Sequence, residues 1–159
     1  MKTFKAVAVG GTFDQLHRGH KALLDKAFEV GGKVLIGLTI DNFVASLGKR
    51  HRTASYDDRL RELELYLSMQ GWTERAQIIP LQDSYGPTIY ITDLDAIVVS
   101  EETEKIAQSI NYIRKKAGYN PLQVIVVCMI PAENKKPIST TRIRNGEIDR
   151  NGHILQRII

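Results

Sequence analysis

The fold of this chain is decided by residues 10–20, which read Gly10-Gly11-Thr12-Phe13-Asp14-Gln15-Leu16-His17-Arg18-Gly19-His20. The preceding residues 4–9 carry apolar side chains in a strand-like pattern, and the apolar side chains of residues 22–28 repeat at helical spacing. The two glycines therefore mark a strand-to-helix turn. Backbone N–H groups left unpaired at the start of that helix, reinforced by the helix dipole, attract anions. This stretch predicts a phosphate-binding site.

Two imidazoles lie in the same stretch. His17 and His20 are three residues apart, so they share one face of the first helical turn, and each can donate a hydrogen bond to phosphate. Gly19 between them lets a flat base approach the backbone closely. The alternative is a tight turn that carries two ordinary, partly exposed histidines. A second phosphate-type segment elsewhere in the chain favours the first interpretation.

That second segment lies near the C-terminus, where residues 138–144 read Ile138-Ser139-Thr140-Thr141-Arg142-Ile143-Arg144. Pro137 favours extended backbone before it, and Ser139 is a good N-cap for a helix that begins at Thr140. Hydroxyl and N–H groups can then converge on one anion. A capped, solvent-facing basic helix is the alternative, which the first motif makes less attractive.

Together, the two motifs resemble the H-x-G-H and I-S-S-T-x-[IV]-R signatures of the nucleotidyltransferases that share a catalytic core with class I aminoacyl-tRNA synthetases. Residues 10–17, 99–103 and 142–149 are most similar to phosphopantetheine adenylyltransferases of the archaeal type, and the resemblance spans nearly the whole chain. Bacterial members of that family carry threonine in place of His17. They also carry an arginine-bearing loop in place of Ser100-Glu101-Glu102-Thr103, so contacts made by that arginine are not transferred to this chain.

The resemblance implies transfer of AMP from ATP to 4′-phosphopantetheine, which yields dephospho-CoA and pyrophosphate in coenzyme A biosynthesis. His20 is implied to stabilise the α-phosphate in the transition state, with His17 near the same phosphates and Lys49 bridging toward the acceptor phosphate. Mg²⁺ is expected to accompany ATP, and no residue is assigned to hold a metal.

The binding residues follow from the same resemblance. ATP is expected to be bound by Gly11, His17, Gly19, His20, Ser100, Glu101, Ser139, Thr140, Thr141 and Arg144. The acceptor is expected to be bound by Thr12, Phe13, Asp41, Lys49 and Arg50. Lys49 and Arg50 are alternatives for the acceptor phosphate, and Asp41 is equally interpretable as a turn or cap residue.

The hydrophobic pattern predicts one α/β domain over residues 1–159. Strands are expected near 4–10, 33–40, 76–81, 95–100 and 122–130, and helices near 18–30, 56–70, 102–117 and 140–146. This alternation indicates a doubly wound, Rossmann-like parallel sheet, for which we expect the order 3-2-1-4-5. In that order the loops after the first and fourth strands face each other across the ligand crevice.

Composition narrows the function class. The chain has 159 residues, of which 43% are hydrophobic, and a net charge of +4. One core fits this length, and so mild a charge suits anionic small molecules as readily as nucleic acid. Because the aromatic residues are scattered and no strong basic stripe accompanies them, we expect no nucleic-acid partner. Apolar runs are too short to cross a membrane, and no signal-peptide core is visible, so we expect a cytoplasmic protein without a membrane partner. The single cysteine, Cys128, is expected in a buried strand, and a monomer is expected although the oligomeric state stays open.

Two other kinds of function remain as alternatives. A sister nucleotidyltransferase would use the same motifs with nicotinamide mononucleotide, FMN or glycerol phosphate as acceptor, because the shape of the acceptor site is poorly visible in sequence. A non-catalytic nucleotide- or RNA-binding module would keep the fold alone. Retention of His17, His20, Ser139 and Arg144 argues against the second alternative.

Overall fold

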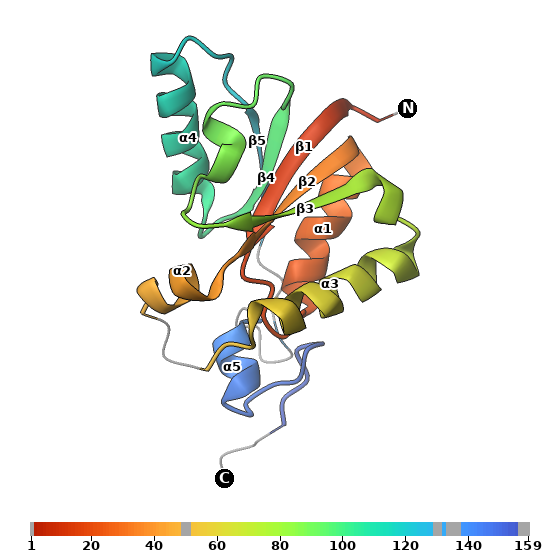
Figure 1. Cartoon of the computed structure of the whole chain (residues 1–159). Helices are drawn as coiled ribbons and strands as arrows, with labels where there is room; N and C mark the ends of the chain where they lie inside the picture. Colours follow the sequence, from red (N-terminus) through yellow and green to blue (C-terminus); the bar gives the residue numbers. More distant parts are fainter. Residues whose placement is uncertain (1, 49–51, 129–131, 133–137, 156–159) are drawn as a thin grey trace.

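The computed structural model of the chain describes residues 2–48, 52–128, 132 and 138–155. Its centre is a parallel sheet of five strands in the order β3-β2-β1-β4-β5 (Figure 1). The strands are β1 (Phe4–Gly11), β2 (Gly31–Thr39), β3 (Ala76–Leu81), β4 (Ala96–Ser100) and β5 (Gln123–Val127). The predicted Rossmann-like fold and strand order are therefore confirmed.

Helices cover both faces of this sheet. Helices α1 (Arg18–Val30) and α3 (Tyr56–Gln70) pack on one face and α4 (Glu104–Lys116) on the other, whereas α2 (Asp41–Ser46) and α5 (Thr140–Arg144) lie beyond the carboxyl ends of the strands (Figure 1). Short 3-10 helices are formed by η1 (Thr73–Arg75) and η2 (Gly86–Ile89). Side chains alternate along β1, so that Val7 and Val9 pack on the side of α1 and α3, whereas Ala8 packs on the side of α4. Both layers are thus built on the same central strand.

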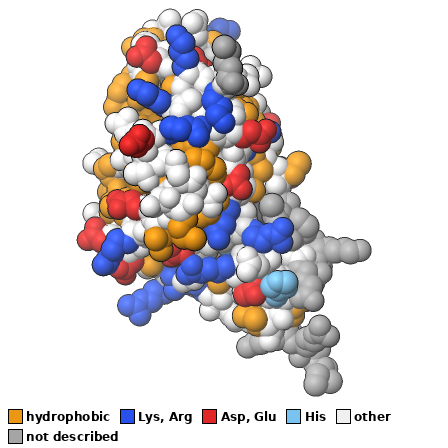
Figure 2. Space-filling view, turned by 90° about the vertical axis from the view of Figure 1, so that its right-hand side faces the viewer, with side chains coloured by type: hydrophobic (Ala, Val, Ile, Leu, Met, Phe, Trp, Pro, Cys, Tyr) orange, Lys and Arg blue, Asp and Glu red, His pale blue; other side chains and the backbone are white. Residues whose placement is uncertain are grey.

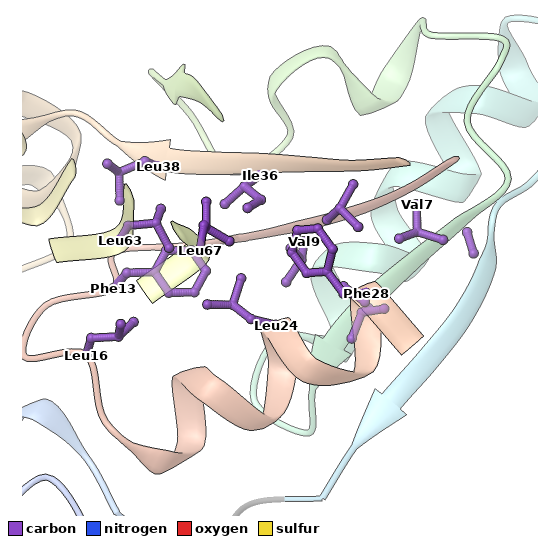
Figure 3. Packing of buried hydrophobic residues seen from close by; sticks show 14 residues of the cluster. Val7, Val9, Phe13, Leu16, Leu24, Phe28, Ile36, Leu38, Leu63 and Leu67 are labelled. Atoms are coloured by element: carbon purple, nitrogen blue, oxygen red, sulfur yellow. The ribbon is translucent and has the colours of Figure 1, made fainter. Parts of the chain in front are cut away.

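The larger core lies between the sheet, α1 and α3 (Figure 3). Leu24 and Phe28 of α1 meet Leu63 and Leu67 of α3 there, and all four side chains are buried. Phe28 also stacks on Trp72, with ring centroids 4.4 Å apart. Because this packing holds α1 against the sheet, it fixes the position of the turn that begins α1.

Two features at the edges of the fold differ from the sequence prediction. Helix α2 was not predicted: it is only six residues long, and no side chain caps its start. Cys128 was predicted in a buried strand, which is wrong: it is exposed and follows the end of β5 at Val127, while residues 129 and 130 lie outside the described residues. β5 is an edge strand with exposed Val126, so an apolar run there does not indicate burial on both faces.

The molecular surface is charged in a mixed pattern. On the face shown in Figure 2, Lys and Arg side chains are interspersed with Asp and Glu, and apolar groups lie between them. In the described part of the chain, no helix combines the length and the apolar character needed to cross a bilayer.

Two leucines of α3 give a matched test of the core. Leu63 is 0% exposed and Leu65 is 62% exposed on the same helix. We expect Leu63→Ala to lower the free energy of unfolding by about 2–5 kcal/mol, because it removes buried contacts and leaves a cavity. Leu65→Ala should change it by less than about 0.5 kcal/mol. Urea denaturation followed by circular dichroism measures both, and equal losses would contradict the assigned packing.

Candidate active site

A cavity of about 740 Å³ lies beyond the carboxyl ends of β1 and β4, where the strand order reverses. Its wall includes most of the predicted ATP-binding residues and two predicted acceptor residues. These are Gly11, Thr12, Phe13, His17, Gly19, His20, Ser100, Ser139, Thr140 and Thr141. The fold thus brings the two motifs, which are more than a hundred residues apart in the chain, to one site.

Other predicted residues are placed differently. Lys49 and Arg50 lie outside the described residues, although the preceding Gly48 lines the cavity. Three predicted residues that the structure describes do not line the cavity: Glu101, Asp41 and Arg144. Glu102, the neighbour of Glu101, does line it. The side chains of Asp41 and Arg144 are instead held in ion pairs with buried partners.

His17 and His20 close the first turn of α1 reciprocally. The Nδ1 atom of His17, the N-cap residue, accepts hydrogen bonds from the backbone N–H groups of Gly19 at 3.0 Å and His20 at 3.3 Å. In return, the Nδ1 atom of His20 accepts from the backbone N–H of His17 at 3.2 Å. The arrangement is a capping box in which imidazoles replace the usual hydroxyl and carboxylate. Each imidazole is therefore oriented by the helix that it begins.

This cap determines the protonation of both rings. A neutral imidazole that accepts at Nδ1 carries its proton on Nε2, so each histidine is a donor through Nε2–H. The rings stack with centroids 3.7 Å apart, and both line the cavity. Burial, with a smaller contribution from the guanidinium of Arg150, lowers the pKa of His17 from 6.5 to about 4. His17 is therefore an uncharged hydrogen-bond donor at neutral pH.

The stacking also accounts for the glycine between the histidines. A Cβ atom at Gly19 would lie 2.8 Å from Cε1 of His17 and 3.0 Å from its Nδ1. The sequence predicts that Gly19 lets a bound base approach the backbone. In the structure, the ring of His17 lies next to Gly19. Any larger residue at this position would push the cap out of place.

The turn before α1 adopts a conformation that its residues do not favour. Phe13 and Gln15 have φ values of 50° and 53°, in the left-handed region that side chains rarely occupy. The ring of Phe13 is buried in the large core. Strain of this kind persists only where surrounding contacts impose it, and it is concentrated at functional sites.

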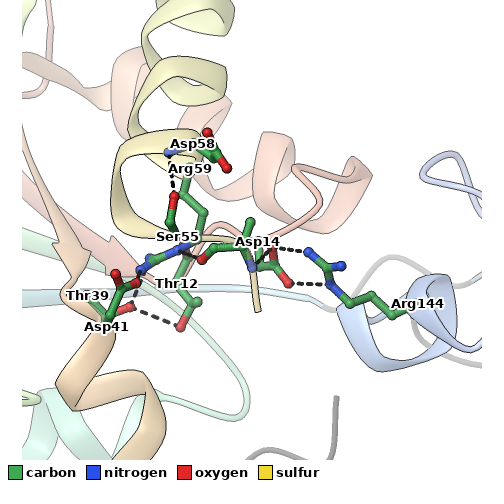
Figure 4. Close-up of polar contacts among 9 residues, drawn as sticks. Thr12, Asp14, Thr39, Asp41, Ser55, Asp58, Arg59 and Arg144 are labelled. Carbon is green, nitrogen blue, oxygen red and sulfur yellow. Dashed lines mark hydrogen bonds and ion pairs between the residues drawn. The ribbon is translucent and has the colours of Figure 1, made fainter. Parts of the chain in front are cut away.

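Arg59 supplies much of that constraint from α3. Its guanidinium is buried and donates to the carbonyl oxygens of Thr12 and Ala54 at 2.9 Å each and to Thr39 Oγ1 at 3.3 Å (Figure 4). It also forms an ion pair with Asp41 at 3.0 Å. Asp41 is the first residue of α2. Through its bonds to Thr12 and Thr39, Arg59 connects the ends of β1 and β2.

Asp14 holds the turn from the opposite side. Its carboxylate is 1% exposed and accepts two hydrogen bonds from Arg144, from Nε and Nη2, both at 2.8 Å (Figure 4). It also accepts from the backbone N–H of Ala54 at 3.2 Å. Removing one partner of a buried ion pair costs about 3–5 kcal/mol, because the other charge stays buried without compensation.

Sequence reasoning missed the roles of Arg59 and Asp14. One signal was available for Arg59: it stands at the start of a predicted helix, where the dipole disfavours a cation. Asp14 stands inside the first motif, but its partner Arg144 is 130 residues away in the chain. No local pattern indicates such a pair.

Comparisons with known proteins identify the family of the chain. The model of the family described as cytidylyltransferase-like matches residues 8–146. The chain is 45% identical over 157 residues to a phosphopantetheine adenylyltransferase of Methanothermobacter thermautotrophicus, covering 99% of this chain and 93% of the relative. It is 49% identical over 149 residues to one of Methanosarcina acetivorans, covering 92% and 93%.

Solved structures show the same fold. A protein of unknown function from Archaeoglobus fulgidus superposes with a TM-score of 0.68 at 34% identity, covering 80% of this chain and 89% of that protein. The pantoate-beta-alanine ligase of Francisella tularensis has a TM-score of 0.59 at 15% identity, covering 91% of this chain and 66% of the ligase. The second likeness concerns the fold alone.

The lowered pKa of His17 predicts a pH dependence of stability. Between pH 6.5 and about 4 the unfolded chain binds a proton at His17 that the folded chain does not, so the free energy of unfolding falls as the pH falls. We expect the wild type to lose about 3 kcal/mol more between pH 7 and pH 4 than His17→Asn, which keeps a capping side chain without a titrating group.

Urea denaturation at a series of pH values measures this difference. His153→Asn is the control, because His153 is an exposed histidine on the C-terminal segment. The loss of stability between pH 7 and pH 4 should be smaller in His17→Asn than in this control. A His17→Asn variant with the same pH dependence as the wild type would contradict the buried, neutral state of His17.

Proposed function

The chain belongs to the cytidylyltransferase-like family and, within it, to the phosphopantetheine adenylyltransferases, and we propose that it transfers AMP from ATP to 4′-phosphopantetheine. The products are dephospho-CoA and pyrophosphate, and the step belongs to coenzyme A biosynthesis. The observation that carries the proposal is the pair of stacked imidazoles, which lines one cavity with the hydroxyl-rich start of α5.

The wall of the cavity has two parts, which we assign to the two substrates. On one side of the turn after β1, the wall of the cavity is formed by β4 and the start of α5, with Ser100, Ser139 and Thr140. On the other side it extends over β2 and β3, with Gly37 and Leu81 among the residues of the wall. We assign the first part to ATP and the second to the acceptor, with the Thr12–Phe13 turn and the imidazoles between them.

In the reaction, an oxygen of the acceptor phosphate attacks the α-phosphorus of ATP. The bond to that oxygen forms, the bond from the α-phosphorus to the bridging oxygen breaks, and pyrophosphate leaves with the electron pair. Negative charge grows on the α-phosphate oxygens, and His20 and His17 stabilise it by donating from Nε2. Prior orientation of both rings by the helix cap lowers the reorganisation that the reaction requires. No covalent enzyme intermediate is needed.

The acceptor phosphate is assigned to the N–H and hydroxyl groups of Thr12 and Phe13 and to a cation of the following loop. Lys49 and Arg50 remain the two candidates for that cation. Both follow Gly48 in the sequence, and Gly48 lines the cavity together with Leu47. ATP phosphates are assigned to Ser139, Thr140 and Thr141.

We propose that Mg²⁺ accompanies ATP. Within the described residues, no group of three or more His, Cys, Asp or Glu side chains could hold a metal ion. The chemistry of the wall fits a cation held by phosphate oxygens and water, which is how magnesium often binds in nucleotide sites. Its contribution is to neutralise phosphate charge, and the side chains named above do the positioning.

Pyrophosphate release tests the reaction directly. We expect release from ATP and Mg²⁺ with 4′-phosphopantetheine, and none above background with nicotinamide mononucleotide, FMN or glycerol 3-phosphate, or when CTP replaces ATP. Release with a different pair would assign the chain a sister activity on the same fold. Silence with every pair, in protein that is folded by circular dichroism, would favour a binding module.

A pair of His20 variants separates catalysis from helix capping. His20→Gln keeps an acceptor at the N3 position of the capping box, whereas His20→Ala removes it. We expect both to lower kcat by about a hundredfold or more, because neither side chain places a donor where the imidazole Nε2–H lies, and to leave the Kd for ATP within about threefold. Only the alanine variant should also lose stability. Recovery of kcat in His20→Gln together with stability would show that His20 acts only as a cap.

A further inference from the structure

We infer that Asp14 is a positioning residue that, through Arg144, fixes the ATP-phosphate segment of α5 against the turn after β1. In this arrangement Arg144 acts on ATP through Asp14 and not as an independent phosphate ligand. The inference rests on the proposed function and deepens it, because it concerns how the two phosphate motifs are held at one site.

The contacts at Asp14 join the motifs at two points. Its carboxylate receives Nε and Nη2 of Arg144 at 2.8 Å each, and its backbone carbonyl accepts from Thr140 Oγ1 at 2.8 Å. Arg144 ends α5 and Thr140 begins it. One residue of the first motif therefore holds both ends of the short helix of the second motif.

The position of α5 determines where ATP phosphates can bind. Ser139, Thr140 and Thr141 line the cavity, and they belong to this helix or cap it. A helix of five residues has little stability of its own, so its orientation depends on tertiary contacts. The neighbouring contacts of the C-terminal segment, such as Arg150 with Gln15 and Glu62, lie beyond the helix.

Burial argues that Arg144 stays with Asp14 when ATP is bound. Asp14 is 1% exposed, so withdrawal of the guanidinium would take two hydrogen bonds of 2.8 Å away from a buried carboxylate. The hydrogen bond to Asp14 also raises the pKa of Arg144, which keeps its guanidinium ionised. Among the described residues that line the cavity, α5 contributes its hydroxyl side chains and not Arg144.

The test is a double-mutant cycle on Asp14 and Arg144, with the Kd for ATP measured by calorimetry without acceptor. We expect Asp14→Asn and Arg144→Gln each to raise that Kd by at least about tenfold. The double variant should lie within about twofold of the worse single variant, because both changes remove the same contact. Arg144→Lys should resemble Arg144→Gln, since a lysine keeps the charge but cannot bind the carboxylate through two parallel hydrogen bonds.

Arg142→Gln is the matched control. It removes a cation from the same helix, paired with Glu147 at 2.9 Å, and leaves Asp14 untouched, so the Kd for ATP should stay within about twofold of the wild type. Steady-state kinetics with Arg144→Lys adds a second readout: KM for ATP should rise while KM for the acceptor changes by less than about twofold.

Several results would overturn the inference. These are additive losses in the double variant, recovery of ATP binding in Arg144→Lys, or an Asp14→Asn variant that is folded and binds ATP as the wild type does. A fall in active fraction with both KM values unchanged would reduce the pair to a stability role and also overturn it. Because the Kd for ATP is measured without acceptor, it tests Asp14 even if the wild type proves to use a different acceptor.

Discussion

The turn between β1 and α1 is held by two buried charges of opposite sign. On one side, Arg59 donates to the carbonyl oxygen of Thr12 in this turn. On the other side, the carboxylate of Asp14 in the same turn accepts from Arg144 and from the N–H of Ala54. Phe13 and Gln15 have left-handed φ values, which are strained for residues with a side chain. Each strained position of this kind costs about 1–3 kcal/mol of stability. These ion pairs and the buried ring of Phe13 offset that strain, and every other part of the site is placed relative to this turn.

Structure and chemistry share the same atoms at the start of α1. Each imidazole uses Nδ1 to satisfy a backbone donor of the helix, which assigns its proton to Nε2, and both rings line the cavity. A donor oriented in this way stabilises developing charge without first having to be ordered. Burial of the same ring, with a smaller effect of Arg150, lowers the pKa of His17, so the ring stays uncharged and Nδ1 can accept the hydrogen bonds of the cap.

The parts of the fold that follow from local patterns were predictable from sequence. Continuous apolar runs indicated the central strands, and the glycine turn followed by two histidines indicated where α1 begins. Helix α2 escaped because six residues without a side-chain cap leave little periodicity, and Cys128 was misplaced because an apolar run was interpreted without knowing that β5 is an edge strand. The wall residues of the two motifs could be named in advance. Arg59 and Asp14 could not be assigned their roles, because their partners become neighbours only in the folded sheet.

The stacking of Trp72 on Phe28 has a practical consequence for spectroscopy. Trp72 is the one tryptophan in the sequence, and its indole lies 4.4 Å from the Phe28 ring, centroid to centroid. Trp72 is not among the described residues that line the cavity. Its fluorescence emission therefore follows the packing of α1 on the core and is insensitive to ligands in the cavity. The unmodified chain carries an intrinsic optical probe that separates loss of fold from loss of binding.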